Sequence, residues 1–569
     1  MPSFNLLPQR YVGWLALTAM MAGCAAVGPD FKTPDTPVVA RYTREAPPQP
    51  VVMGEAVAPE WWMAFGSSRL DDLVKQALHD SFTLAAAEAT LRQAQQLHAA
   101  QAGSTLYPTV NARLGASRNQ ANAAGRGESG NRQTLYHLYN AGVAVNYNLD
   151  LFGGNRRALE ALAAQADYQA YQLAGARLAL AGNIVTTAFG QAQVGEQITA
   201  TEAILQAQQD QLDIARKRFD LGATARTDVL ALQTQVEQTR ASLPALRNRL
   251  EQADHLLAVL TARAPGAADI PRFTLADFTL PGRLPVVVPS DLVRQRPDIQ
   301  ASTALLHAAT AQYGVAVANL YPQIDLSASL GTQALTTGAL FGPGSMIWTL
   351  AGQLAQPLFN AGLKAGANAA EASLQAAGAN YQQTVLEALR NVADTLRQLD
   401  NDAQALQAQA AADTSAQASL DLVRQQYRLG AASYLQLLTA QQQAQQTRIG
   451  LIAAQAARLA DSAALYQAMG GGVLDTPQAV GAATPAVTSA TVPPGFQEHH
   501  DRQGDQGPGQ PAADGFDDGR ADEHLAPDRR GIGQFQREPA GGPECRSQWA
   551  GYGHSFRFRP EGTRRPASG

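Results

Sequence analysis

The sequence contains one unit twice. Leu106-Tyr107-Pro108 recurs as Leu320-Tyr321-Pro322, 214 residues later, and Leu221-Gly222-Ala223 recurs as Leu429-Gly430-Ala431, 208 residues later. Because the two offsets are close and the order of the motifs is kept, we infer the duplication of a unit of roughly 200 residues. Each copy is therefore expected to contribute an equivalent set of elements to the fold.

Each copy predicts a very long helix. Residues 155–220 and 363–428 contain no proline and little glycine, and they are rich in Ala, Leu and Gln. At 1.5 Å per residue each helix is nearly 100 Å long, by a rough estimate. Shorter return helices are predicted over 227–263 and 433–469, and a further helix over 71–102. Helices of this length cannot bury themselves in one compact core, so we expect them to pack along each other as coiled coils.

Each copy also predicts a β-hairpin, over residues 107–150 and 321–357. Apolar residues alternate with small or polar ones, as in Ile324, Leu326, Ala328 and Leu330. Strands of about ten residues with one apolar face are typical of transmembrane β-barrels. A half-buried sheet of a soluble protein alternates in the same way, so this pattern alone leaves both alternatives open. The long helices and the N-terminal segment favour the barrel.

The N-terminus has the features of an export signal. The apolar stretch 11–22 is too short to cross a bilayer, which needs about 20 apolar residues. It ends in Met21-Ala22-Gly23-Cys24, which resembles a bacterial lipobox. That resemblance implies that Cys24 is lipidated and begins the mature chain, and Ala25 after it implies sorting to the outer membrane. An ordinary signal peptide with a chance cysteine is the alternative.

Composition argues against several other function classes. The formal net charge of −5 disfavours nucleic-acid binding, and the four lysines never follow a glycine, which excludes a phosphate-binding P-loop. CxxC and HExxH motifs are absent from the sequence. The glycine-rich run at 125–130 joins two predicted strands, so it is not a dinucleotide site. We find no set of nucleophile, base and stabiliser, and we expect no enzyme activity, no cofactor and no bound metal.

Several segments resemble the TolC-like outer membrane factors, specifically the outer membrane efflux lipoproteins. They occur in family order between about residues 20 and 475 and include the Arg-Pro-Asp-Ile segment beside the duplicated Leu-Tyr-Pro. The segments are Gly23-Cys24, Val27-Gly28-Pro29-Asp30-Phe31, Trp61-Trp62, Phe65-Gly66, Leu106-Tyr107-Pro108, Leu151-Phe152-Gly153-Gly154, Arg296-Pro297-Asp298-Ile299, Leu358-Phe359-Asn360-Ala361-Gly362 and Leu465-Tyr466-Gln467-Ala468-Met469-Gly470.

The resemblance implies a mainly α-helical protein with a transmembrane β-barrel portion. In this family three chains form a twelve-stranded barrel in the outer membrane, which continues into a periplasmic α-helical coiled-coil barrel. Four strands cannot close a barrel, and open sheet edges are not tolerated in lipid. The implied function is a passive exit duct of a tripartite efflux pump. Its partners would be outer-membrane lipid, a periplasmic adaptor and an inner-membrane transporter, but not nucleic acid.

Three alternative functions stay open. The chain could serve type I protein secretion or metal efflux through the same kind of channel. It could also be a structural coiled-coil surface lipoprotein, which would need no duplicated hairpins. The exported compound is not encoded in any motif.

The resemblance also indicates two sites beyond Cys24. The turns Leu221-Gly222-Ala223 and Leu429-Gly430-Ala431 join long helices and are expected at one end of the tube, where the family docks its adaptor. Ordinary helix termination by glycine is the alternative. Asp394, in Asn391-Val392-Ala393-Asp394, resembles a carboxylate that narrows the entrance near this tip. A solvated surface aspartate is the alternative.

The expected domain order is a signal peptide (1–23), an extended linker (24–65), the first repeat (66–263), a second linker (264–289), the second repeat (290–475) and a tail (476–569). From residue 495 on, the tail holds 14 Gly and seven Pro, and its only Leu, Ile, Val or Met residues are Leu525 and Ile532. Such a segment cannot bury enough apolar surface to fold, so we expect disorder, with Cys545 unpaired. Whether the tail is functional or a frameshift product stays open; a stop codon after Pro477 should leave trimer assembly and efflux intact.

Overall fold

The computed structural model describes residues 26–35, 41–43, 51–122, 133–267 and 269–472. The chain divides after residue 487, and all described residues belong to the unit before that point. The signal peptide, Cys24, the glycine-rich run at 125–130 and the tail with Cys545 therefore lie outside the described residues.

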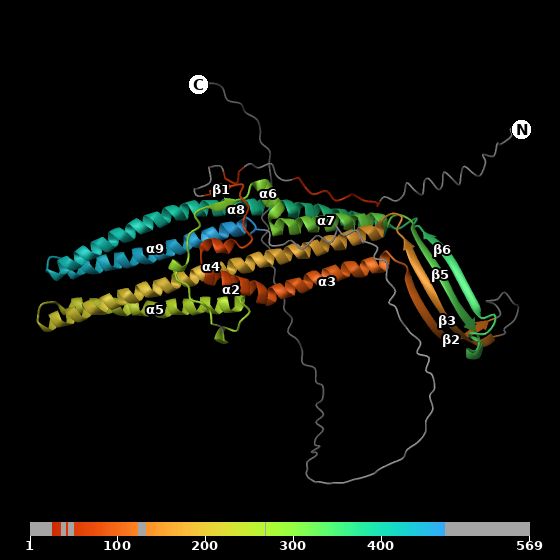
Figure 1. The fold of residues 1–569 in the computed structure, drawn as a ribbon, viewed down its shortest axis with the longest axis horizontal. Helices are drawn as coiled ribbons and strands as arrows, with labels where there is room; N and C mark the ends of the chain where they lie inside the picture. The colour runs from red at the N-terminus through yellow and green to blue at the C-terminus, as the bar shows by residue number, and fades with distance from the viewer. Residues whose placement is uncertain (1–25, 36–40, 44–50, 123–132, 268, 473–569) are drawn as a thin grey trace, which may run out of the picture. The chain divides into compact units, whose positions relative to one another are not determined.

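Two long helical hairpins dominate the fold. The first consists of α4 (Gly154–Asp220) and α5 (Arg226–Leu260), and the second of α8 (Ala361–Arg428) and α9 (Tyr434–Ala468) (Figure 1). Every boundary lies within three residues of its predicted position. The predicted long helices and their return helices are confirmed.

The predicted single helix over 71–102 is wrong, because two helices occupy this region. They are α2 (Ser68–Asp80) and α3 (Phe82–Thr105), separated by Ser81 in an extended conformation with ψ 121°. The Ser81 hydroxyl accepts a hydrogen bond from the Leu84 amide at 3.4 Å and so caps the second helix. Serine competes with the helical backbone in this way, and the break reorients α3 relative to α2.

Two helices of the second copy have no counterpart in the predictions. They are α6 (Pro289–Gln295) and α7 (Pro297–Ala318), and each begins with a proline. Proline is tolerated at the first helical position because the N–H there needs no helical partner. The small residues of α7 allow it to pack closely against both α4 and α8.

A four-stranded antiparallel sheet joins the two copies. It contains β2 (Thr109–Asn122), β3 (Gln133–Leu149), β5 (Gln323–Ala334) and β6 (Met346–Ala355), in the order β2-β3-β5-β6. The predicted hairpins are present, and their inner strands β3 and β5 pair with each other. The outer edges of β2 and β6 are unpaired in the sheet that the structure describes.

Both expected linkers contribute to the core. The first contains β1 (Val51–Met53) and a 3-10 helix, Trp61–Phe65, and the second contains β4 (Leu284–Val286), which pairs in parallel with β1. Trp61, Trp62 and Phe65 are buried, and Trp61 stacks on Tyr466 at a centroid distance of 5.5 Å. These aromatic rings bury large apolar areas, so the segment around Trp61 is part of the folded body.

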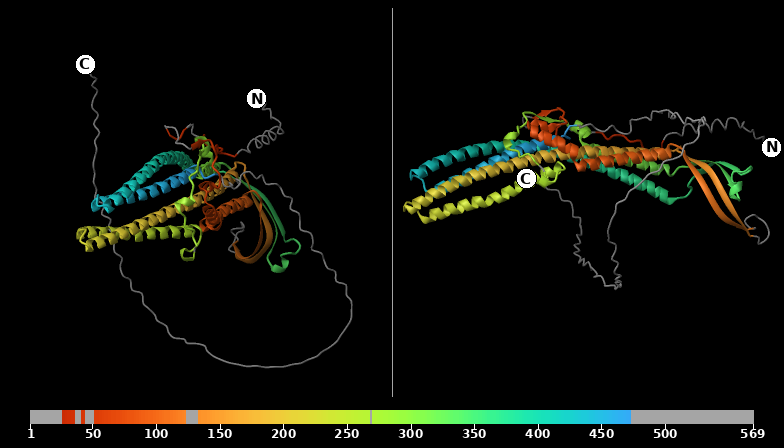
Figure 2. Two further views of the ribbon diagram at one scale, coloured as in Figure 1. Left: turned by 60° about the vertical axis from the view of Figure 1, so that its left-hand side comes forward. Right: turned by 60° about the horizontal axis from the view of Figure 1, so that its bottom comes forward.

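The helical hairpins extend from this core in one direction, and the sheet lies at the opposite end (Figures 1 and 2). Helices α3 and α7 lie alongside α4 between the core and the sheet. Among the described helices, none combines the length and the apolar character needed to cross a membrane.

Candidate functional site

The sheet has one apolar face. Residues directly opposite each other in the register share a face, and β2 places Val110, Ala112 and Leu114 opposite Val145, Val143 and Ala141. The same row continues through β5 into β6. Side chains on this face are open to solvent; Leu114 is 84% exposed and Leu350 75%. A soluble sheet would bury such a face, so this surface requires an apolar environment outside the chain.

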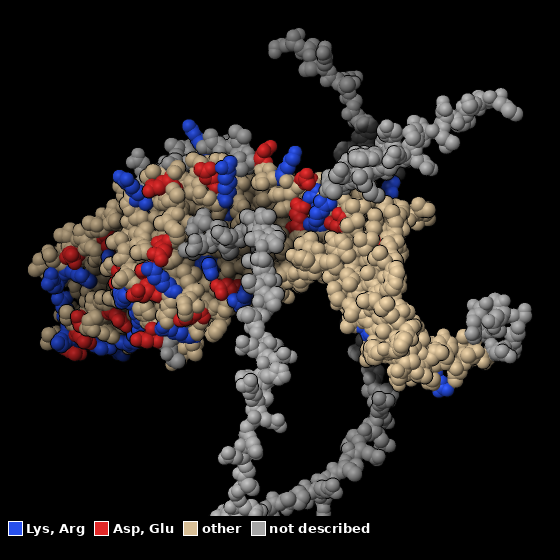
Figure 3. Space-filling model, turned by 45° about the vertical axis from the view of Figure 1, so that its right-hand side comes forward, with Lys and Arg blue, Asp and Glu red and all other residues tan. Residues whose placement is uncertain are grey.

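The opposite face is mostly polar or small, and its larger side chains include Tyr136, Leu138 and Ile347. It carries Asn111, Arg113, Gly115 and Ser117 of β2, Asn140, Gly142, Ala144, Asn146 and Asn148 of β3, Gln323, Asp325, Ser327, Ser329 and Gly331 of β5, and Ile347, Thr349, Ala351, Gln353 and Ala355 of β6. Figure 3 shows how few charged side chains the sheet exposes compared with the helices. A sheet with one apolar and one small-polar face suits a boundary between lipid and water.

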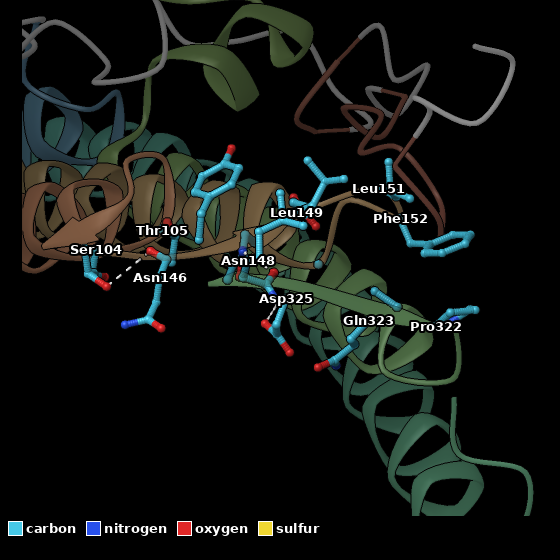
Figure 4. A pocket seen from close by; sticks show the side chains of 18 of the residues that line it. Ser104, Thr105, Asn146, Asn148, Leu149, Leu151, Phe152, Pro322, Gln323 and Asp325 are labelled. Carbon is cyan, nitrogen blue, oxygen red and sulfur yellow. Dashed lines mark hydrogen bonds between the residues drawn. The ribbon is translucent and has the colours of Figure 1, made fainter. Parts of the chain in front are cut away.

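A pocket lies where the sheet joins the helices. Its volume is about 510 Å³, and Asn146, Asn148 and Asp325 are among its lining residues (Figure 4). The Asn148 amide donates to Asp325 at 2.8 Å, and Asn155 at the start of α4 donates to Asn148 at 3.2 Å. This chain of hydrogen bonds connects the first turn of α4 to the polar face of β5.

The two Leu-Gly-Ala turns lie at the same end of the molecule, as predicted (Figure 1). In the first, the Gly222 and Ala223 amides donate to the carbonyls of Phe219 and Arg218. The second repeats this pattern, and the φ angles of Gly222 and Gly430 are 74° and 77°. These are glycine-terminated helix ends.

Each turn exposes a leucine at the tip. Leu221 is 84% exposed and Leu429 is 85% exposed. Equivalent positions in the two copies thus present the same apolar side chain. A glycine turn can close the hairpin without a leucine at this position.

A groove runs between the two helical hairpins next to these turns. Its volume is about 530 Å³. The guanidinium of Arg218 in α4 lies 5.3 Å from the ring centre of Tyr427 in α8, and Gln442 of α9 donates to Gln235 of α5 at 3.2 Å. The walls of the groove carry both cationic groups such as Arg218 and acidic ones such as Asp210 and Asp421, beside apolar side chains such as Ile214.

Asp394 lies away from the turns. It is an exposed residue of α8 and precedes Leu429 by 35 residues, which corresponds to about 50 Å along a helix. Its carboxylate has no hydrogen bond or ion pair within the part of the chain that the structure describes. A carboxylate at this position can act at mid-length of the helical region, and not at its tip.

The segment that follows Cys24 is bound tightly to the helices. Arg157 of α4, whose side chain is 5% exposed, donates to Asp30 at 2.5 Å and to Glu160 at 2.7 Å. It also donates to the carbonyls of Val27 and Gly28 at 3.4 and 3.5 Å. A guanidinium with four oxygen partners holds a chain segment firmly.

Ring stacking, close backbone packing and a backbone hydrogen bond complete this attachment. Phe31 stacks on His307 of α7 at a centroid distance of 4.3 Å. Gly28 has a φ of 88°, and a Cβ there would lie 2.7 Å from the Gly314 Cα, so only glycine fits. The Val27 amide donates to the Phe152 carbonyl at 3.0 Å. Residues 26–31, here called the N-terminal strap, therefore bridge α4 of the first copy and α7 of the second.

The partners of the strap could not be found from the sequence. In the sequence, Val27 to Phe31 stands out only as a segment of the family pattern, and Arg157 and His307 carry no local signal. They meet because α4 and α7 pack together.

One half-buried carboxylate carries a strong pKa shift. Burial, together with a hydrogen bond to Asp402 and the charge of that residue, raises the pKa of Asp461 to about 7, while Arg458 opposes the shift. Asp461 lies on α9 and Asp402 on α8. The Asp461 Oδ2 atom is buried with no hydrogen-bond partner among the described residues. Groups of three or more potential metal ligands are absent from that part of the chain.

Comparison with known proteins places these features in a family. The model of the family described as outer membrane efflux protein matches residues 73–263 and 288–471. The toluene efflux pump outer membrane protein TtgC of Pseudomonas putida is 29% identical over 466 residues, covering 80% of this chain and 95% of TtgC. The probable outer membrane lipoprotein SilC of Salmonella typhimurium is 28% identical, covering 80% of this chain and 96% of SilC.

Solved structures share the fold. The outer-membrane channel OprN superposes with a TM-score of 0.73 at 28% identity, covering 78% of this chain and 99% of OprN. The Campylobacter jejuni outer membrane channel CmeC gives a TM-score of 0.74, covering 79% of this chain and 95% of CmeC. At 20% identity, that likeness concerns the fold alone.

Proposed function

The chain belongs to the outer membrane efflux protein family, and we propose that three copies of it form one channel, to which each contributes four strands of a twelve-stranded transmembrane barrel. The protein is an outer-membrane component of an efflux pump. The proposed channel continues into a tube built from the helical hairpins and conducts solutes passively.

The observation that carries this proposal is the uncovered, two-faced sheet. Its edge strands β2 and β6 are unpaired within the described chain, and unpaired backbone groups are too costly in lipid. Closure therefore requires other chains, and barrels need at least eight strands. Three copies give twelve strands, with the apolar face toward lipid and the polar face around a lumen.

The helical hairpins supply the periplasmic part of the proposed tube. Their tips present Leu221 and Leu429 beside the groove that contains Arg218 and Tyr427. An adaptor that offers apolar helix ends and polar side chains fits this surface, and an inner-membrane transporter completes the pump. Cysteines introduced at Leu221 and Leu429 should cross-link to the adaptor in cells, and a cysteine at Leu97 on α3 serves as the exposed control. Equal cross-linking at all three positions would argue against docking at the tips.

Lipidation of Cys24 adds a second membrane anchor. The N-terminal strap begins at Ala26, which lies against Gly153 at the start of α4. The proposed lipid attachment point precedes Ala26 by two residues in the sequence. Mass spectrometry of the mature N-terminus tests this role, and an unmodified N-terminus at another residue would contradict it.

Asp394 is proposed to restrict the helical tube at mid-length. Threefold symmetry brings three exposed carboxylates to one level, where they attract cations. Asp394→Ala should raise basal conductance or weaken cation preference. If conductance and ion selectivity are both unchanged in this variant, Asp394 does not line the lumen.

The cargo class follows from the relatives. One of them is named for toluene efflux, and on this basis we propose small toxic organic compounds as the exported class. Loss of the gene should then sensitise cells to solvents and antibiotics of low molecular mass, and complementation should restore resistance. Unchanged sensitivity to all such compounds would contradict this assignment.

Purified protein in a planar bilayer tests the channel directly. We expect stepwise conductance from a species with the mass of three chains. A trimer that never conducts would instead favour a structural surface lipoprotein, and a stable monomer would contradict the barrel.

A further inference from the structure

One row across the sheet brings an arginine next to two glycines. Arg113 of β2 is opposite Gly142 of β3, which is opposite Gly331 of β5, which is opposite Ile347 of β6. All four positions lie on the polar face. Arg113 is therefore followed across the sheet by two positions without side chains.

The two glycines are required by the close approach of their strands. A Cβ at Gly142 would lie 2.9 Å from the Gly331 Cα, and a Cβ at Gly331 would lie 2.6 Å from the Ala141 carbonyl oxygen. A hollow of about 540 Å³ opens here, with Arg113, Gly142, Gly331 and Ile347 among its lining residues. Because neither glycine carries a side chain, Arg113 has no side-chain neighbour on β3 or β5 in this row.

Arg113 is exposed and carries an uncompensated charge within the described residues. No hydrogen bond or ion pair of its guanidinium occurs there. On the polar face of the described strands, the only other charged residue is Asp325. Asp325 is six residues from Gly331 along β5, which corresponds to about 20 Å at the rise of an antiparallel strand.

We propose that Arg113 is an anion-binding residue that determines selectivity in the lumen of the barrel. This inference rests on the trimeric channel proposed above, in which threefold symmetry places three Arg113 guanidinium groups at one level. Rings of charged side chains set the ion preference of pores, and guanidinium is the side chain best suited to sulfate, phosphate and carboxylate groups. The ligand class is therefore an organic or inorganic polyanion.

The opposing charges of Asp325 are too distant to cancel this effect. The Debye length is about 10 Å at 0.1 M salt, about half the separation between the two levels. Anions should therefore encounter a locally positive zone at the level of Arg113 in the barrel. This zone is separate from the negative zone at the level of Asp325, where the sheet joins the helices. The effect should weaken as the salt concentration rises.

Arg118 supplies a matched control. It is on the same strand five residues later, and it lies on the apolar face opposite His137. Arg113→Gln and Arg118→Gln remove the same charge from the two faces. Both variants are first checked for trimer formation, and Arg113→Lys keeps the charge if Arg113→Gln fails to assemble.

The experiment measures block of single-channel current by sucrose octasulfate added on the barrel side. In 0.1 M salt, Arg113→Gln should weaken the block at least tenfold, Arg118→Gln should leave it unchanged, and Arg113→Lys should retain most of it. Equal block in the wild-type protein and the Arg113→Gln variant, or no block of the wild-type channel, would overturn the inference while leaving the channel proposal intact. A wild-type trimer without conductance would overturn the proposed function, and this inference with it.

Discussion

At the scale of single residues, Arg157 makes long-range contacts that its neighbours in the sequence do not predict. Its guanidinium binds the strap through Asp30 and two backbone carbonyls, and it holds Glu160, which also contacts His307 at 2.9 Å. One side chain thus joins the N-terminal segment to helices of both copies. The position of the proposed lipid anchor depends on this contact.

Arg157→Ala should lower the free energy of unfolding by about 2–3 kcal/mol, because hydrogen bonds to charged groups contribute about 1.5–3 kcal/mol when a partner is lost. Thermal or urea unfolding of the purified protein measures the change. The control is Arg247→Ala, whose ion pair with Glu202 at 2.8 Å is exposed; exposed pairs contribute less than about 1 kcal/mol. If the two variants lose the same free energy of unfolding, the contacts of Arg157 with the strap contribute no more than an exposed ion pair.

Asp461 should make stability depend on pH. Its pKa is raised from 3.8 to about 7 in the folded chain, so between these values the folded state binds more protons than the unfolded state. The free energy of unfolding therefore falls as the pH rises from about 4 to about 7, and the loss persists above that range. Asp461→Asn should flatten this dependence and raise the unfolding temperature at pH 8. The exposed Glu237→Gln serves as control, and a slope that survives in Asp461→Asn would contradict the assignment.

At the scale of elements, the Leu-Gly-Ala turns depend on backbone conformation alone. A Cβ at Gly222 or Gly430 would meet no atom within 4 Å, yet both residues have positive φ. Gly222→Ala should therefore cost about 1–2 kcal/mol through left-handed strain. Gly366 lies inside α8 and also has open space around it. Gly366→Ala should therefore increase the free energy of unfolding, because Gly→Ala in a helix stabilises by about 0.5–1 kcal/mol. Unfolding midpoints of both variants test the pair, and a stabilising Gly222→Ala would contradict the turn geometry.

At the scale of the whole molecule, the two faces of the sheet should respond oppositely to charge. Val143→Lys places a charge on the apolar face of the central strand β3, which costs about 2–4 kcal/mol near the middle of a bilayer. Ala144→Lys, one residue later and opposite Ser329 on the polar face, should be tolerated. The measurement for both variants is the amount of trimer that stays in the membrane fraction after peripheral proteins are extracted. Similar insertion of the two variants would show that the apolar face does not contact lipid.

Much of the fold could be predicted because its signals are local. The absence of proline over 155–220 and the glycine turn at Gly222 define α4 and the start of its return helix within a few residues of their observed bounds. The alternation in β5 predicts a strand with two unlike faces. These patterns depend only on helix and strand periodicity, which neighbours in sequence determine.

The remaining features were decided by tertiary structure, because they depend on groups far apart in the chain. The burial of Trp61 needs Tyr466 beside it. Arg157 meets Asp30 across 127 residues, and Arg113 is set beside Gly142 and Gly331 only by strand register. The sequence by itself determined the periodic elements and the duplicated plan, since each follows from residues within a few turns. Long-range packing and register alone decided which side chains meet, since their free energies exist only once the elements are assembled.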